Sequence, residues 1–334
     1  MIGILFTGGT ISMKLDPATG GAVPALSAEE IFALVPGLGD IADIEIEDFS
    51  RLPGPHITPE QMWRLAGRAA AWLDRPDVDG LVITHGTDTI EETAYLLDLV
   101  LLSDKPVVLV GAMRTVSDVG WDGPANLLAA VRVAACPAAR GQGVLIVMDD
   151  HILPAREARK VHTESSSSFA TPEFGPLGQV DAGAVIFRRH TMARADWRDA
   201  SAEPGLRVAR LETRVEMVQA YTGMDCGPID YVCSRGPRGL AVIAFGRGNV
   251  PPAILPALRR ALDAGIVVTV SSRCVAGRVS PRYGYDGGGL QLKQMGAILA
   301  GDLSGAKARL LQMVALGYAP DTKEARALIA TMTA

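Results

Sequence analysis

The stretch GLVITHGTDTIEETAYLLDL, residues 80–99, contains a strand-like run, a polar turn and the start of a helix. Its first residues are apolar and predict a short buried strand. Thr89 is followed three residues later by Glu92, which is the spacing of a capping box and predicts that a helix begins here. Apolar residues then recur at helical spacing from Ile90 to Leu101. The intervening HGTDT is therefore expected at the carboxyl end of a strand, where open α/β sheets bind ligands.

Strand-like and helix-like segments alternate on both sides of this stretch through the first half of the chain. The expected strands are residues 2–7, 41–49, 105–112 and 143–148, and the expected helices are 27–35, 58–73 and 126–135. Strands and helices that take turns in this way are typical of a parallel sheet with helices on its faces. We therefore predict an α/β fold with a larger N-terminal domain built on a doubly wound parallel sheet.

The second half of the chain predicts a smaller domain. Periodicity is lost at residues 191–213, where charge, small residues and a Pro-Gly pair predict a linker. The alternation then resumes in the strand-like or helix-like segments 239–246, 251–265, 266–272, 305–316 and 322–332. A strand, helix, strand unit of this kind implies a second α/β domain. The expected division is an N-terminal catalytic domain at 1–190, the linker at 191–213 and a C-terminal domain at 214–334.

The composition favours a globular protein that acts on a small molecule. The chain has 334 residues, of which 48% are hydrophobic and 21% charged, and its net charge is −5. Lys and Arg are dispersed along the sequence, which indicates neither a nucleic-acid partner nor a membrane surface. The chain begins directly on an expected strand rather than on a basic segment followed by an apolar one, so a cytoplasmic location is expected.

The cysteines and histidines lack the spacing of metal ligands. The four cysteines are expected to be free thiols: Cys136, Cys226, Cys233 and Cys274. The five histidines show no paired spacing, so no metal or organic cofactor is expected. His85 is expected to shape the turn that contains it.

A second polar turn follows the first expected strand. FTGGTIS, residues 6–12, places Thr10 directly after two glycines. Taken alone it is a tight turn, and neither turn has the glycine spacing of a dinucleotide fingerprint, which argues against a dehydrogenase. HGTDT, however, adds hydroxyls, an acid and a histidine where a turn needs only Gly86. Two such turns at one edge of a sheet predict a pocket.

A basic segment supplies a third candidate. PAREARKVHT, residues 154–163, carries Lys160 close to Arg156 and Arg159 and is expected to be a loop after the strand 143–148. A lysine in such a loop is most simply a solvated side chain. Neighbouring positive charges and partial burial both lower the pKa of a lysine, however, and would make a neutral amine available as a base.

Several motifs together carry a family resemblance. They are ILFTGGTIS, GLVITHGTDTIEETAYLLDL, PVVLVGAMR followed by DGPANL, RKVHT, GRGNV and GDLSGAKARLLQMVAL. In this combination the chain resembles the bacterial L-asparaginase family, threonine amidohydrolases that include the glutaminase-asparaginases, from residue 2 to about residue 320. The resemblance implies a small-molecule amide substrate and a homo-oligomer, a tetramer arranged as a dimer of intimate dimers.

The resemblance also assigns roles to individual residues. Thr10 matches the nucleophilic threonine, and Thr87, Asp88 and Lys160 match the second catalytic group. The implied substrate-binding positions are Gly9, Gly54, Gly86, Ala112, Asn249 and Asp286. In the family, the residue at Ala112 offers its backbone carbonyl to the leaving amide nitrogen, and the residue at Asn249 reaches the site of a neighbouring subunit.

These residue types fit amide hydrolysis. A threonine hydroxyl is too weakly acidic to attack an amide unaided, so it needs a base and donors that stabilise the oxyanion. We expect neutral Lys160, held by Asp88, to activate Thr87 or a water beside it, while Thr10 carries the acyl group until water releases it. Backbone amides near Thr10 and Thr87 would stabilise the oxyanion, and Gly9 would allow a close backbone approach.

The chain departs from the family pattern at three positions around the amino-acid head group. Residues 14–30 lack the tyrosine that family members carry in this loop. Gly54 aligns with a serine that binds the substrate α-carboxylate, although Ser50 lies four residues earlier. Gly289 aligns with an acidic residue that binds the α-amino group, and Asp286 is the carboxylate close by. These departures predict that amide hydrolysis persists while the substrate has changed or is held differently.

Three functions remain open on the sequence. The first is an amidohydrolase that releases ammonia from the side-chain amide of L-asparagine or a close analogue. The second is a hydrolase of another small amide, lactam or imide that lacks the amino-acid head group. The third is a metabolite-binding protein that kept the fold without turnover, for which the missing tyrosine is the single argument. The complete set of Thr10, Thr87, Asp88 and Lys160 favours an enzyme.

Overall fold

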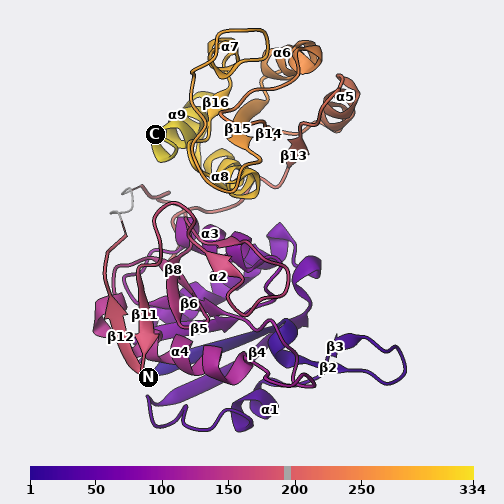
Figure 1. Cartoon of the computed structure of the whole chain (residues 1–334). Helices are drawn as coiled ribbons and strands as arrows, with labels where there is room; N and C mark the ends of the chain where they lie inside the picture. Colours follow the sequence, from indigo (N-terminus) through magenta and orange to yellow (C-terminus); the bar gives the residue numbers. More distant parts are fainter. Residues whose placement is uncertain (192–196) are drawn as a thin grey trace. The chain divides into compact units, whose positions relative to one another are not determined.

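The computed structural model describes residues 1–191 and 197–334, which form two compact units (Figure 1). The first unit comprises Met1–Asp196 with Pro204–Leu206, and the second comprises Trp197–Glu203 with Arg207–Ala334. The predicted linker, residues 191–213, includes 192–196, which lie outside the described residues. Its later part contributes to both units, since 204–206 return to the first.

An eight-stranded sheet, in the order β12-β11-β8-β7-β6-β5-β1-β4, forms the centre of the first unit. Five of these strands run parallel to one another: β4 (Ile44–Leu52), β1 (Ile2–Gly8), β5 (Gly80–Thr84), β6 (Val107–Val110) and β7 (Val144–Met148). The predicted parallel sheet is confirmed over these strands. The apolar residues of β1, β5, β6 and β7 suit a sheet that is buried on both faces, whereas the edge strand β4 carries charged residues and is only partly buried.

Three antiparallel strands that the sequence analysis did not predict extend the sheet beyond β7. They are β8 (His151–Pro154), β11 (Gly178–Asp181) and β12 (Ala184–Phe187). The turn between β7 and β8 consists of Asp149 and Asp150, whose φ angles are 50° and 61°. Aspartate tolerates this left-handed conformation better than most residues, so the chain reverses here in a tight hairpin.

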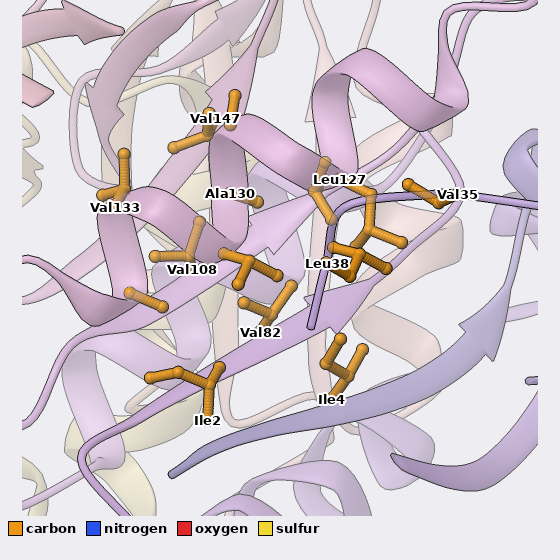
Figure 2. Close-up of a cluster of buried hydrophobic side chains, with 14 of the residues drawn as sticks. Ile2, Ile4, Val35, Leu38, Val82, Val108, Leu127, Ala130, Val133 and Val147 are labelled. Carbon is orange, nitrogen blue, oxygen red and sulfur yellow. The ribbon is translucent and has the colours of Figure 1, made fainter. Parts of the chain in front are cut away.

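Helices cover both faces of this sheet. They are α1 (Ala28–Ala33), α2 (Pro59–Asp74), α3 (Ile90–Val100) and α4 (Gly123–Ala135). Ile2 and Ile4 of β1 point toward the face on which Leu127 of α4 packs (Figure 2). Gly3, which points to the opposite face, lies so close to α2 that a Cβ there would be 2.5 Å from the ring of Trp72. Alternate residues of one strand thus pack against helices on opposite faces, which confirms the doubly wound arrangement.

The helix starts show one error in the sequence analysis. Ser27 with Glu30 and Thr58 with Gln61 form capping boxes at α1 and α2. At α3, however, the Thr89 side chain makes no capping hydrogen bond and instead donates to the carbonyl of Gly54 at 2.8 Å. The predicted capping box is therefore wrong, and Thr89 has φ −125° and ψ 6° rather than the extended backbone of Ser27 and Thr58, whose side chains do cap.

Short elements complete the first unit. They are η1 (Thr10–Ser12), β2 (Met13–Leu15), β3 (Ala22–Pro24), η2 (Gly54–His56), η3 (Pro137–Ala139), β9 (Arg159–Lys160) and β10 (Phe169–Ala170). Strands β2 and β3 pair in the indigo hairpin that extends away from the sheet in Figure 1. Thr7 lies within β1, in agreement with the expected strand at residues 2–7. One expectation changes in detail, since Lys160 lies in a two-residue strand rather than in a loop.

The second unit is built on a smaller, parallel sheet in the order β13-β14-β15-β16. Its elements are β13 (Val215–Gln219), α5 (Gly227–Ser234), β14 (Gly239–Ala244), η4 (Pro252–Ile254), α6 (Leu255–Asp263), β15 (Val267–Ser272), α7 (Gly289–Met295), β16 (Ile298–Leu299), α8 (Gly305–Tyr318) and α9 (Thr322–Met332). Val242 of β14 packs with Leu258 of α6 on one face. Gln312 of α8 donates to the Thr269 hydroxyl at 2.5 Å on the other. The predicted second α/β fold is confirmed.

Candidate active site

The strand order places two of the predicted turns at a switch point of the sheet. From β1 the chain passes to β4 at one edge, and from β5 it passes to β6 in the opposite direction. A crevice forms at the carboxyl ends of two neighbouring strands whose connections diverge in this way. Gly9 and Thr10 follow β1, and residues 85–89 follow β5.

Three glycines from three loops pack backbone against backbone at this edge. Gly9 has φ +85°, and a Cβ there would lie 2.5 Å from the nitrogen of Gly86. A Cβ on Gly86 would in turn lie 2.6 Å from the nitrogen of Gly54. Side chains at Gly9 and Gly86 would therefore force the loops apart. The structure brings together Gly9, Gly54 and Gly86, which the sequence analysis had assigned to substrate binding.

The two threonines of the first turn have different surroundings. The Thr7 backbone nitrogen donates to Thr84 Oγ1 at 3.2 Å, and Thr7 Oγ1 donates to the Thr84 carbonyl at 2.6 Å, both buried. Thr10, in contrast, is half-buried at the start of η1. Among the residues that the structure describes, none hydrogen-bonds to the Thr10 hydroxyl or accepts from its backbone N–H. Thr7 is thus committed to joining β1 and β5, whereas Thr10 is available to a ligand.

Lys160 joins the second turn through its side chain. Its Nζ donates to Thr87 Oγ1 at 3.0 Å and to Asp88 Oδ1 at 2.7 Å. Thr87 is buried, the Lys160 side chain is 18% exposed and the Asp88 side chain is 59% exposed. An amine next to a hydroxyl can exchange a proton with it, and the carboxylate balances the charge of the resulting ammonium. Three of the four predicted catalytic residues therefore form one hydrogen-bonded group.

His85 is fully buried beneath this group. Its Nδ1 is 2.9 Å from the Gly86 carbonyl, and its Nε2 is 2.9 Å from Thr93 Oγ1. Because a carbonyl only accepts, Nδ1 carries the proton and Nε2 accepts from Thr93. Burial lowers the pKa of His85 to about 4, so the ring is neutral near pH 7. The expectation that His85 shapes its turn agrees with these bonds.

The loop after β6 packs against the same turn. A Cβ on Gly111 would lie 2.7 Å from the carbonyl oxygen of His85. Asn126 of α4 donates to the Gly111 carbonyl at 3.1 Å and so ties the loop to this helix. Ala112 is buried, and no residue in the described part of the chain donates to its carbonyl oxygen. That oxygen is thus a free acceptor.

Two predicted substrate-binding residues lie in the second unit. Asn249 Oδ1 accepts from the backbone nitrogen of Gly289 at 3.2 Å, so these positions are neighbours. Asp286 is exposed and accepts from Gln291 Nε2 at 3.4 Å. Asn249 and Asp286 belong to the second unit, whereas Thr10 belongs to the first. Their roles toward substrate remain predictions.

Ser50, four residues before Gly54, carries the hydroxyl nearest in the sequence to the one that Gly54 lacks. Its Oγ donates to the Thr7 carbonyl at 2.9 Å. A serine hydroxyl carries one proton, so this bond leaves Ser50 no donor for a substrate carboxylate. The geometry therefore argues against Ser50 in that role.

The sequence analysis did not single out Glu91, although it lies within the decisive motif. The Glu91 carboxylate accepts a hydrogen bond from the backbone nitrogen of Lys160 at 2.5 Å and lies 3.8 Å from the Arg159 guanidinium. A glutamate in the first turn of a helix is ordinary. No local spacing could have indicated a partner 69 residues away.

No helix in the described part of the chain is both long enough and apolar enough to cross a membrane.

Family models match the chain in two segments. The N-terminal asparaginase domain matches residues 1–193, and the glutaminase/asparaginase C-terminal domain matches residues 214–329.

Individual relatives match along nearly the whole length. A probable L-asparaginase of Deinococcus radiodurans is 39% identical over 97% of this chain and 95% of its own. A probable periplasmic L-asparaginase of Haemophilus influenzae is 34% identical over 96% of this chain and 90% of its own. The crystal structure of a probable cytoplasmic L-asparaginase from Campylobacter jejuni is 35% identical, covers 98% of both chains and superposes with a TM-score of 0.85. With family models and relatives matching from end to end, this chain belongs to the asparaginase family.

Proposed function

We propose that this protein is an L-asparaginase-type amidohydrolase, which converts the side-chain amide of L-asparagine or a close analogue to the acid and ammonia. The observation that carries the proposal is that Lys160 Nζ lies within hydrogen-bonding distance of both Thr87 and Asp88. Gly86 of the same turn packs against Gly9, the chain neighbour of the unengaged Thr10. A protein that only binds a metabolite has no need of this group. The family membership and the fold support the same reaction.

In the proposed mechanism Thr10 is the nucleophile. Its hydroxyl oxygen adds to the amide carbonyl, and the backbone N–H groups of Thr10 and Thr87, which no described residue engages, stabilise the oxyanion. The C–N bond then breaks, the nitrogen takes up a proton and leaves as ammonia, and Thr10 holds the acyl group as an ester. The Ala112 carbonyl accepts a hydrogen bond from the leaving nitrogen.

Lys160 and Asp88 assist the transfer of the proton that Thr10 loses. The proton that Thr10 loses passes through Thr87, or through a water beside it, to the Lys160 amine across the 3.0 Å contact, and from there to the leaving nitrogen. Asp88, 2.7 Å away, stabilises the ammonium that forms. Water then adds to the ester, the bond between the acyl carbon and the Thr10 oxygen breaks to release the acid, and the other proton of that water passes to the Thr10 oxygen.

A second substrate class is supported by the head-group departures. Gly54 offers no hydroxyl, the hydroxyl of Ser50 is already bonded to Thr7, and residues 14–30 contain no tyrosine. A small amide, lactam or imide without the α-amino and α-carboxylate groups loses nothing from these absences. This alternative keeps the same four catalytic residues.

We also propose how the protein assembles and where in the cell it lies. We propose a homo-oligomer, a tetramer built as a dimer of dimers, in which Asn249 reaches the site of a neighbouring subunit. A cytoplasmic location agrees with that of the probable cytoplasmic relative from Campylobacter jejuni, whereas the Haemophilus influenzae relative is described as periplasmic. The division into domains at 1–190 and 214–334, joined by a linker, also remains a proposal.

Hydrolysis of a panel of amides and imides separates the two substrate classes. Ammonia release reports on the primary amides, and loss of the starting compound reports on the cyclic imides, whose ring opens without releasing ammonia. The panel contains L-asparagine, D-asparagine, L-glutamine, succinamate and small cyclic imides. If L-asparagine is turned over fastest, the altered head-group positions are replacements within an asparaginase. If asparagine is inert while succinamate or an imide is hydrolysed, the substrate has changed. If none of these compounds is hydrolysed, the proposed function fails.

A further inference from the structure

The backbone of Lys160 lies at the free edge of a very short strand. Within the described residues, β9 pairs with β10 alone, and Lys160 is opposite Phe169. The next pair is hydrogen-bonded, since Val161 N donates to the Ser168 carbonyl at 2.7 Å. Because hydrogen-bonded and non-hydrogen-bonded pairs alternate in an antiparallel ladder, the N–H of Lys160 points away from β10. It needs another acceptor.

Glu91 supplies that acceptor. One oxygen of its carboxylate accepts from the Lys160 backbone nitrogen at 2.5 Å, and the other lies 3.8 Å from Arg159 Nε. The Glu91 side chain is 16% exposed, so water competes little for this bond. The contact ties the outer edge of β9 to the first turn of α3.

The same element therefore holds Lys160 at two points. Glu91 is the second residue of α3, and Thr87 and Asp88 lie just before this helix. The backbone of Lys160 is fastened to Glu91, and its Nζ bonds to Thr87 and Asp88. A lysine side chain is long and flexible, so a fixed backbone position limits where its amine can go.

We propose that Glu91 is a positioning residue for the reaction, which anchors the backbone of Lys160 so that its amine stays beside Thr87. The inference rests on the proposed function, because it assigns Lys160 a role in turnover. Its essential feature is a hydrogen-bond acceptor at the right reach, not a negative charge. Loss of the anchor lowers kcat and leaves KM nearly unchanged, because Glu91 is argued to act through Lys160 alone.

Three substitutions separate reach from charge. Glu91→Gln keeps the length of the side chain and a carbonyl oxygen, so kcat stays within about threefold of wild type. Glu91→Asp keeps the charge but is one methylene shorter, and Glu91→Ala lacks both. For these two we expect kcat to fall by about 10- to 100-fold, the scale of a misplacement of about 1 Å in a catalytic group.

Glu60→Ala is the matched control. Glu60 is the second residue of α2, the same helix position that Glu91 has in α3, and it is exposed. Its removal takes away the same favourable charge at a helix start without touching Lys160. This variant keeps the kcat of wild type.

Hydrogen exchange at the Lys160 backbone amide tests the anchor without reference to activity. We expect slow exchange in wild type and Glu91→Gln, and fast exchange in Glu91→Asp and Glu91→Ala. The inference is overturned if Glu91→Asp keeps more activity than Glu91→Gln, or if exchange at Lys160 does not respond to Glu91→Ala. Wild-type protein that hydrolyses no amide yet shows the expected exchange pattern would instead contradict the proposed function, together with the catalytic meaning of the anchor.

Discussion

Lys160 donates to both Thr87 and Asp88. Its substitution should lower kcat strongly and change the free energy of unfolding little. Lys160→Met should lower kcat by about 10²- to 10⁴-fold, the usual contribution of a general acid or base. Because Asp88 is more than half exposed, loss of the ion pair should change the free energy of unfolding by no more than about 1 kcal/mol. Ammonia release and urea unfolding measure the two effects.

Lys105→Met is the control for this substitution. Lys105 Nζ donates to the carbonyls of Leu73 and Arg75 at the end of α2, at 2.7 Å each, and contacts no candidate site residue. Its loss should destabilise the protein by about 1–3 kcal/mol and leave kcat unchanged. If Lys160→Met also kept its kcat, Lys160 would have no role in turnover.

His85 predicts a dependence of stability on pH. Its pKa is about 4 in the folded protein against 6.5 for an unperturbed histidine, so the unfolded chain binds the proton more tightly. The stability that depends on neutral His85 is fully present above pH 6.5 and is lost as the pH falls toward 4. Between pH 7 and pH 5 this contribution is worth about 2 kcal/mol.

Urea unfolding of wild type and His85→Asn at both pH values isolates this contribution. Asparagine retains a donor for the Gly86 carbonyl but does not titrate. The variant should be less stable at pH 7, and the difference should shrink by about 2 kcal/mol at pH 5. A difference that is the same at both pH values would mean that His85 does not gain a proton on unfolding.

At the scale of elements, Thr89 links two loops rather than capping α3. Thr89→Val removes its hydrogen bond to the Gly54 carbonyl, while the Ile57 backbone nitrogen still donates to that oxygen at 3.1 Å. The cost in stability should therefore stay below about 1 kcal/mol. We expect kcat/KM to fall by about tenfold or more, since the loop carrying Gly54 loses its tie to the turn, and Thr89→Ser to restore it.

Thr58→Val provides the contrast, because Thr58 does cap its helix α2. This variant should lose about 0.5–2 kcal/mol of stability with no change in kcat/KM. The same loss of stability and an unchanged kcat/KM in Thr89→Val would restore the capping role that the spacing predicted.

The comparison of these two threonines explains how far sequence reasoning reaches. Thr58 and Thr89 have equivalent local spacing, and spacing shows only which local bonds are available. The two threonines differ in backbone conformation, since Thr58 is extended with ψ 163° whereas Thr89 has ψ 6°, and the Thr89 hydroxyl donates to Gly54, 35 residues away. Periodicity predicted the parallel strands and their helices, but it did not predict that Lys160 lies in the strand β9. Repeating apolar patterns record burial over many residues, whereas a two-residue strand leaves no pattern.

In the candidate site, too, local motifs could be predicted from the sequence, whereas contacts between distant residues could not. Thr87 and Asp88 are adjacent in the chain, and a local motif together with the family resemblance indicated them. The anchor of Lys160 on Glu91 spans 69 residues and required coordinates. Likewise, the hydrogen bond from Ser50 to the Thr7 carbonyl could not be predicted from the sequence, because it joins residues that are 43 positions apart.

At the scale of the whole molecule, Asn249 lies in the second unit and Thr10 in the first. If Asn249 completes the site of a neighbouring subunit, Thr10→Ala and Asn249→Ala should each be inactive as pure proteins. Mixing them under conditions that exchange subunits should restore partial activity, because some sites then receive both native residues. Light scattering would establish the oligomer, and a mixture that stays inactive despite subunit exchange would contradict a shared site.

The central claim is that Thr10 is the nucleophile, and its neighbour Thr7 provides the control. Ammonia release from the preferred amide and urea unfolding should be measured for Thr10→Val and Thr7→Val. Thr10→Val should lose turnover and keep its stability, whereas Thr7→Val should lose about 1–2 kcal/mol of stability through the bond from its hydroxyl to the Thr84 carbonyl and keep its turnover. Undiminished ammonia release by folded Thr10→Val would contradict the account.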